Sequence, residues 1–243
     1  MSENSVQRVA AKKLDRAGVG RLITVLVSSL VVAAIFFGAA GTLAVPRAWI
    51  YYGGLIGYLL VVVVAMALFA PGVAEVVNAR GRPFKKDVKT WDKVVGLAMA
   101  MLMFLAPAVA GLDVGRWHGP SVPFLLAVPS LVVTLLAYAF VNWAMVVNRH
   151  AETGVRIQND REHQVVSSGP YRFVRHPFYI SLIVVNLVYP LAVGSLWAYV
   201  PSFAMAAIYA WRTAREDATL QAELKGYVEY AARVRFRLVP GVW

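Results

Sequence analysis

The sequence contains no cysteine, few acidic residues and only four histidines. The absence of cysteine excludes disulfide bonds, a thiolate nucleophile and any cysteine-ligated metal site. The histidines, His118, His150, His163 and His176, show no metal-ligand spacing, so we expect no metal centre. A Gly-x-Ser-x-Gly nucleophile elbow and a phosphate-binding glycine loop are also missing from the sequence. These absences remove the motifs of several common hydrolases and nucleotide-binding enzymes.

Long apolar runs dominate what is present. Hydrophobic residues make up 59% of the 243 residues, and the mean hydropathy is +0.61. Runs at 22–45, 48–70, 94–112 and 122–147 are each long enough to predict a membrane-spanning helix. The run 178–211 is too long for one span, and Pro190 and Gly194 are expected to divide it into a tight helical hairpin of two more. The sequence therefore predicts an all-α integral membrane protein with about six transmembrane helices.

The distribution of positive charge predicts the orientation of these helices. Only Arg47 and Arg116, of the 24 Lys and Arg residues, lie outside the N-terminal tail, the connections 72–93 and 148–176, and the C-terminal tail. Because Lys and Arg favour the cytosolic side of a membrane, both termini are expected to be cytosolic. Topology then accounts for the net charge of +11, and we expect no nucleic-acid partner. The first apolar run lacks a clear cleavage site, so it is expected to be retained.

Candidate functional residues are concentrated in the last part of the chain. We therefore divide the sequence into residues 1–147, which hold the basic tail and four transmembrane helices, and residues 148–243, which hold the expected catalytic part. The connection 148–176 contains three of the four histidines. Connections of this length are usually either functional or disordered. The active site is accordingly expected on the cytosolic side.

The stretch 169–179, which reads GPYRFVRHPFY, combines charged and aromatic residues just before an apolar run. Pro177 suits the first turn of a helix, with His176 at or near its cap. His176 and Tyr179 are three residues apart and should project on one side of that turn. A helix N-terminus favours a carboxylate or phosphate group of a ligand. The competing interpretation is an interfacial belt of aromatic residues, with arginines that contact lipid phosphates.

A second cluster follows the last apolar run and contains Arg212, Arg215, Glu216 and Asp217. In a continuous helix, one face would carry Glu216, Leu220, Glu223, Tyr227 and Tyr230, although Gly226 weakens such a helix near its end. Surface ion pairing, for instance between Arg212 and Glu216, would explain the cluster without any function. The functional interpretation is a carboxylate that accepts hydrogen bonds from an ammonium group or a ribose hydroxyl.

These motifs resemble the isoprenylcysteine carboxyl methyltransferase family, which is related to the membrane phospholipid methyltransferases. The similar residues are Gly169-Pro170-Tyr171, Arg175-His176-Pro177, Tyr179, Glu216 and the closing pattern within 226–240. The resemblance covers about residues 150–243, while the first four spans are similar only in hydropathy. It implies an S-adenosylmethionine-dependent methyltransferase whose cofactor site is closed by a cytosolic C-terminal helix. It also implies a lipid-like or prenylated acceptor that enters from the bilayer.

The resemblance also implies roles for individual residues. The implied cofactor-binding residues are Gly169, Pro170, Tyr171, His176, Pro177, Tyr179 and Glu216. Our own hypothesis is that Arg175, His176 and Glu216 are the catalytic residues, with Arg175 orienting the acceptor or the cofactor's carboxylate. Related families often have two glutamates where this chain has Glu216-Asp217, which leaves open whether Glu216 or Asp217 makes the acidic contact.

The methyl acceptor is expected to be amphipathic. A carboxylate acceptor is already ionised at neutral pH, so carboxyl O-methylation is favoured, whereas an amine would need a base such as Glu216 or His176. One alternative is an NADPH-dependent membrane oxidoreductase similar to the sterol reductases, which share an Arg-His-Pro element. The other is a non-enzymatic membrane protein that binds lipid or serves as a scaffold.

Overall fold

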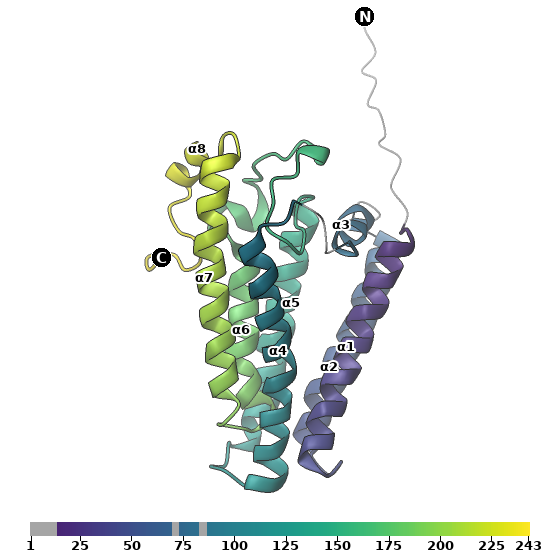
Figure 1. The fold of residues 1–243 in the computed structure, drawn as a ribbon. Coiled ribbons are helices and arrows are strands. Elements are labelled where there is room, and N and C mark those ends of the chain that lie inside the picture. The colour runs from purple at the N-terminus through teal and green to yellow at the C-terminus, as the bar shows by residue number, and fades with distance from the viewer. Residues whose placement is uncertain (1–13, 70–72, 83–86) are drawn as a thin grey trace, which may run out of the picture.

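The computed structural model describes residues 14–69, 73–82 and 87–243 (Figure 1). Within them, no residue forms a β-strand. The α-helices are α1 (Arg16–Ala40), α2 (Pro46–Phe69), α3 (Val73–Arg80), α4 (Thr90–Leu112), α5 (Ala127–Val147), α6 (Pro177–Val193), α7 (Tyr199–Glu223) and α8 (Tyr227–Arg233). Short π- or 3-10-helical turns lie at Asp113–Trp117, Phe124–Leu126, Asn159–Arg161 and Gly169–Arg172. The predicted all-α fold is confirmed.

Among the described residues, four helices, α1, α2, α4 and α5, are long and apolar enough to cross a membrane. They correspond to the four apolar runs before residue 148, and the protein is an integral membrane protein. α1 begins earlier than its apolar run, at Arg16, because the Asp15 side chain accepts a hydrogen bond of 2.9 Å from the Gly18 N–H. This cap extends the helix by almost two turns beyond the expected membrane boundary.

α6 and α7 form the expected helical hairpin, and of the two predicted breaks, Pro190 and Gly194, only Gly194 ends α6. α6 continues through Pro190 and ends at Gly194, whose φ of 89° lies in the left-handed region. Pro190 falls in the last turn, where the loss of one backbone donor leaves the rest of the helix intact. At 17 residues, α6 is shorter than the roughly 20 residues that usually span a bilayer. The count of six spans therefore stays a prediction.

The basic segments gather at one end of the helices. The start of α1, the short helix α3 and the C-terminal α8 all lie at this end in Figure 1, whereas the turn between α6 and α7 lies at the opposite end. This arrangement agrees with the charge distribution, which predicted that these segments share one side of the membrane. That this side faces the cytosol stays a prediction. We call it the α8 end below.

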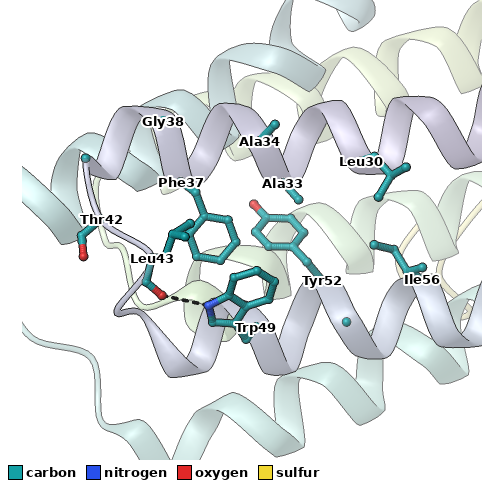
Figure 2. Close-up of a pocket in the computed structure, with 12 residues that line it drawn as sticks. Leu30, Ala33, Ala34, Phe37, Gly38, Thr42, Leu43, Trp49, Tyr52 and Ile56 are labelled. Atoms are coloured by element: carbon teal, nitrogen blue, oxygen red, sulfur yellow. Dashed lines mark hydrogen bonds between the residues drawn. The ribbon is translucent and has the colours of Figure 1, made fainter.

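At the opposite end, α1 and α2 pack against α4 and α6. Phe36, Tyr52, Ala110 and Tyr189 belong to the buried cluster there, and the hydroxyl oxygens of Tyr52 and Tyr189 are 2.8 Å apart. An apolar hollow of about 730 Å³ lies between α1 and α2, where the Trp49 indole donates a hydrogen bond to the Leu43 carbonyl (Figure 2). Its lining has no acid or base apart from the Tyr52 phenol, so it offers little to catalysis.

The expected continuous helix through residues 216–230 is wrong. α7 ends at Glu223, Gly226 has a φ of 82°, and α8 starts at Tyr227. The glycine adopts a left-handed conformation that turns the chain at low steric cost. The buried side chains of Leu224, Tyr227 and Tyr230 then pack together. α8 is thus a separate helix that folds back on the end of α7.

Candidate functional site

Asp217 is the centre of the polar network at the α8 end. Its side chain is fully buried and accepts two hydrogen bonds from Arg175, from Nε at 2.8 Å and from Nη2 at 3.0 Å. Arg237 donates to it from Nε at 2.9 Å, and the Tyr227 hydroxyl donates at 2.9 Å. The carboxylate therefore joins α7 to the segment before α6, to α8 and to the C-terminal tail.

The charge of Asp217 is stabilised by these partners. Burial by itself would raise the pKa of Asp217, but hydrogen bonds with His176, Arg175 and Arg237 outweigh burial and hold that pKa well below its usual value. Burial and the adjacent Asp217 carboxylate raise the pKa of Tyr227 well above its ordinary value. Asp217 thus stays ionised and Tyr227 stays a neutral donor at physiological pH.

The segment before α6 is held in place by backbone hydrogen bonds. The N–H groups of Arg175 and His176 donate to the carbonyls of Phe236 and Arg237, each at 2.9 Å. Arg175 Nη1 also donates to the carbonyls of Val234 and Arg235, each at 2.9 Å. Every guanidinium nitrogen of Arg175 is therefore engaged by protein groups. The geometry makes Arg175 a link between chain segments.

His176 is the N-cap residue of α6, as predicted, but its ring points into the Asp217 network. Its Nε2 lies 3.1 Å from Asp217 Oδ1 and 3.3 Å from the Tyr227 hydroxyl. The centroids of the His176 and Tyr179 rings are 6.1 Å apart, which is consistent with the predicted common side of the first turn. Asp217 and Tyr227 together hold the orientation of this imidazole.

Glu216 lies next to Asp217 in sequence but has a different environment. It accepts a hydrogen bond of 2.5 Å from the Tyr179 hydroxyl, which connects α7 to α6. The Arg212 guanidinium lies 5.6 Å from the centre of the Tyr179 ring and forms a two-point ion pair with Asp92, at 2.6 and 3.0 Å. Arg212 thus has Asp92 as its ion-pair partner, and Glu216 lines the cavity with the Tyr179 hydroxyl as its hydrogen-bond donor.

A cavity of about 1130 Å³ connects this network with the apolar part of the helices. Its polar end is lined by Tyr171, His176, Tyr179, Arg212 and Glu216. Its apolar walls come from α1, α2, α4, α5 and α6, and include Leu26, Leu55, Met103, Val141 and Val185. One continuous space thus brings acidic and aromatic groups together with a hydrocarbon-like surface.

The connection between α5 and α6 forms one wall of the polar end. Arg156 pairs with Glu152 at 2.8 Å and with Asp87 and Asp160, each at 2.7 Å. Gln158 is buried and donates to the His150 carbonyl at 2.6 Å. The predicted loop is therefore ordered by ion pairs, and its cluster of charged residues is not a freely solvated surface.

The structure places the predicted site residues in two groups. The walls of the cavity include Tyr171, Arg175, His176, Tyr179 and Glu216. Gly169, Pro170 and Pro177 do not line it and instead shape the backbone behind it. Gly169 has a φ of 55°, and a Cβ there would lie 2.9 Å from a methyl group of Val147. A glycine is required at this turn because the conformation is left-handed and the space is filled.

Sequence reasoning missed two members of the site. Arg237 binds Asp217 from the C-terminal tail, and Arg80 lines the cavity from α3. Neither of these residues lies in the two short motifs that attracted attention. The periodicity that included Tyr227 assumed a continuous helix, so it indicated the right residue for the wrong geometric reason.

Comparison with known proteins supports one family. A search of curated proteins found no match to this chain. Residues 129–222 match the model of the isoprenylcysteine carboxyl methyltransferase (ICMT) family. The matched region starts in α5, contains the whole stretch 169–179 and both Glu216 and Asp217, and ends in α7, so α8 and the C-terminal tail lie outside it. The resemblance predicted from the motifs is thereby confirmed: over residues 129–222 this chain is similar to the ICMT family, a family of membrane methyltransferases.

Proposed function

We propose that the protein is an S-adenosylmethionine-dependent methyltransferase that methylates a carboxylate on a lipid-like or prenylated acceptor. The observation that carries this proposal is the continuous cavity that runs from Glu216 and Tyr179 to the apolar helix walls. Its volume of about 1130 Å³ exceeds the roughly 300–1,000 Å³ of ordinary small-molecule sites. The space suits a polar cofactor and an apolar acceptor held side by side.

The residues at the polar end suit the proposed cofactor. Tyr171 and Tyr179 supply aromatic faces, which attract a cationic sulfonium, and Glu216 supplies a carboxylate for an ammonium group or ribose hydroxyl. In the part of the chain that the structure describes, His150 Nδ1 and Thr153 Oγ1 are buried without a hydrogen-bond partner, and both residues line the cavity. Buried polar atoms normally have partners, so a polar ligand would complete this wall.

When bound, S-adenosylmethionine supplies a methyl group on a positively charged sulfur. The carboxylate oxygen of the acceptor forms the new C–O bond while the C–S bond breaks and its electron pair stays on sulfur, so no proton has to be removed. The protein's contribution is to position both molecules and to exclude water. In this proposal Glu216 and Tyr179 touch the cofactor. Arg175 and His176 act as positioning residues because Asp217 already holds both side chains.

This assignment also proposes an answer to the choice between the two acidic residues. Both carboxylate oxygens of Asp217 accept hydrogen bonds from Arg175, Arg237 or Tyr227, and the residue is fully buried. Glu216 lines the cavity and has the Tyr179 hydroxyl as its partner there. We therefore assign the acidic cofactor contact to Glu216. If the acceptor were an amine, the same carboxylate could take the proton that methylation releases.

Calorimetry on the detergent-solubilised full chain tests the proposal. We expect the wild type to bind S-adenosylhomocysteine saturably and to show no comparable binding of NADPH. The affinity for S-adenosylhomocysteine should fall about tenfold in Glu216→Gln, because a charge-assisted hydrogen bond is lost. Glu229→Gln is the matched control, since Glu229 is exposed on α8 and does not line the cavity. Binding of NADPH alone would favour the reductase alternative, and binding of neither would reject both enzyme assignments.

A further inference from the structure

Arg80 is a cation in the cavity wall whose partners leave its charge uncompensated. Its Nη1 makes only long hydrogen bonds, of 3.3 Å to the Ala151 carbonyl and 3.4 Å to the Glu152 carbonyl. The guanidinium carbon lies over the Phe178 ring, 4.9 Å from its centre. Within residues 14–69, 73–82 and 87–243, no carboxylate pairs with Arg80. A partly buried cation with such neighbours favours an anion beside it.

The charges around Arg80 strengthen this preference. Burial, followed by the nearby Arg21, lowers the pKa of Arg80 to about 10, with Arg212 adding to the effect. Arg80 therefore keeps its charge at neutral pH and is repelled by Arg21. Arg212 differs from both because Asp92 is its partner in a two-point ion pair. An incoming anion would relieve the repulsion between Arg21 and Arg80.

The position of this pair indicates which ligand would supply the anion. Arg21 lies on α1, directly before the residues 22–26 that line the cavity, and Arg80 ends α3. The two arginines thus stand where the apolar walls of α1 meet the polar end. Arg80, Tyr171 and Tyr179 line the same cavity. A carboxylate bound by Arg80 would therefore have an apolar chain on one side and the Glu216–Tyr179 pair on the other.

We propose that Arg80, supported by Arg21, binds the carboxylate of the methyl acceptor and so selects acidic amphiphiles over neutral ones. This inference rests on the proposed function for the identity of the ligand. It assigns the selecting residues to α1 and α3, which lie outside the residues that match the family. An interfacial arginine that contacts lipid phosphates would face outward, whereas Arg80 lies against the Phe178 ring and in the cavity wall.

The test compares an N-acetylated S-prenylcysteine that has a free carboxylate with its carboxamide, which has the same apolar chain and no charge. Equilibrium binding of each is measured on the full chain in detergent without cofactor. We expect Arg80→Gln to weaken binding of the acid about ten- to a hundredfold and to leave binding of the amide unchanged, because one charge-assisted contact is removed. Arg80→Lys should recover part of the affinity, and Arg21→Gln should show a smaller loss.

Arg215→Gln is the control for net charge, because Arg215 is exposed, stacks on Trp91 and Trp211, and does not line the cavity. Binding of S-adenosylhomocysteine is measured in the same variants. If Arg80→Gln weakens binding of S-adenosylhomocysteine and leaves binding of the prenylcysteine acid unchanged, Arg80 binds the carboxylate of the cofactor and the inference is wrong. An equal loss of affinity for the acid and the amide in Arg80→Gln, or no loss of affinity for either ligand, also overturns the inference. Failure of the wild type to bind S-adenosylhomocysteine rejects the proposed function, whereas the comparison of acid with amide still decides the role of Arg80.

Discussion

Asp217 on α7 accepts hydrogen bonds from both Nε and Nη2 of Arg175, at 2.8 and 3.0 Å, in the interior of the α8 end. The two residues are 42 positions apart in the chain. Arg175 also donates to carbonyls of the C-terminal tail, and Arg237 of that tail donates to Asp217 Oδ2, which Arg175 Nη2 binds as well. This pair therefore connects three segments that surround the polar end of the cavity.

We predict that Asp217→Asn strongly destabilises the α8 end. The substitution keeps the size of the side chain but leaves the buried Arg175 without its counter-charge, and breaking a buried ion pair typically costs about 3–5 kcal/mol. Thermal unfolding in detergent, followed by size-exclusion chromatography, measures the loss. Asp87→Asn is the control because the Asp87 side chain is 54% exposed and Arg156 keeps two other carboxylates. Equal stability of the two variants would show that the Asp217 network does not hold the fold.

We predict that Tyr179→Phe weakens cofactor binding without unfolding the protein. The ring stays in place against Tyr209, but Glu216 loses the hydroxyl that orients it. Loss of one hydrogen bond to a charged group corresponds to a roughly tenfold lower affinity. Calorimetry with S-adenosylhomocysteine measures this effect. Tyr199→Phe, at the far end of α7, should bind as the wild type does, and an unchanged affinity in Tyr179→Phe would remove this tyrosine from the binding site.

We predict that stability falls as the pH drops from about 6.5 towards 4, in part because of His163. Burial, the neighbouring His150 and Arg156 lower the pKa of His163 to about 4 in the folded protein. The unfolded chain takes up a proton near the ordinary histidine pKa of about 6.5, so it binds more protons than the folded chain between these values. The stabilising contribution is therefore complete above pH 6.5 and is lost as the pH falls through this window.

The measurement for His163 is the melting temperature in detergent at several pH values. His163→Gln should flatten the curve between pH 6.5 and 4, since the titrating ring is gone. His118→Asn is the control, because His118 is exposed at the opposite end of the helices and asparagine tolerates its φ of 52°. A slope in His163→Gln equal to that of the wild type would contradict the prediction.

We predict that Gly169→Ala destabilises the turn before α6. The left-handed φ of 55° costs an alanine about 1–2 kcal/mol, and its Cβ would lie 2.9 Å from a Val147 methyl group. The substitution should therefore distort the turn and lower the melting temperature. It should also lower the affinity for S-adenosylhomocysteine, since Tyr171 lies in the same turn. Gly57→Ala is the matched control because that glycine is in α2 and has open space around it. A Gly169→Ala variant that is as stable as Gly57→Ala would show that the turn tolerates a side chain.

The sequence by itself determined the class of protein and the approximate position of its helices. Membrane spans depend on the length and apolar content of a continuous segment, which are local properties, so four spans could be predicted directly. The N-cap at His176 depends on the adjacent Pro177, which is also local. Of the two predicted breaks in the run 178–211, Gly194 ends α6 and Pro190 does not, because the effect of a proline depends on how near it lies to the helix end.

Only the tertiary structure decided how the candidate site is assembled. Glu216 and Asp217 are neighbours in sequence, but successive residues of a helix point about 100° apart, and packing determines which of them is buried. The Asp217 partners Arg237 and Tyr227 reach it because Gly226 turns the chain after α7. Arg80 comes to the cavity from a helix that shows no motif. These contacts join segments far apart in the chain, and their formation depends on the packing of the whole bundle.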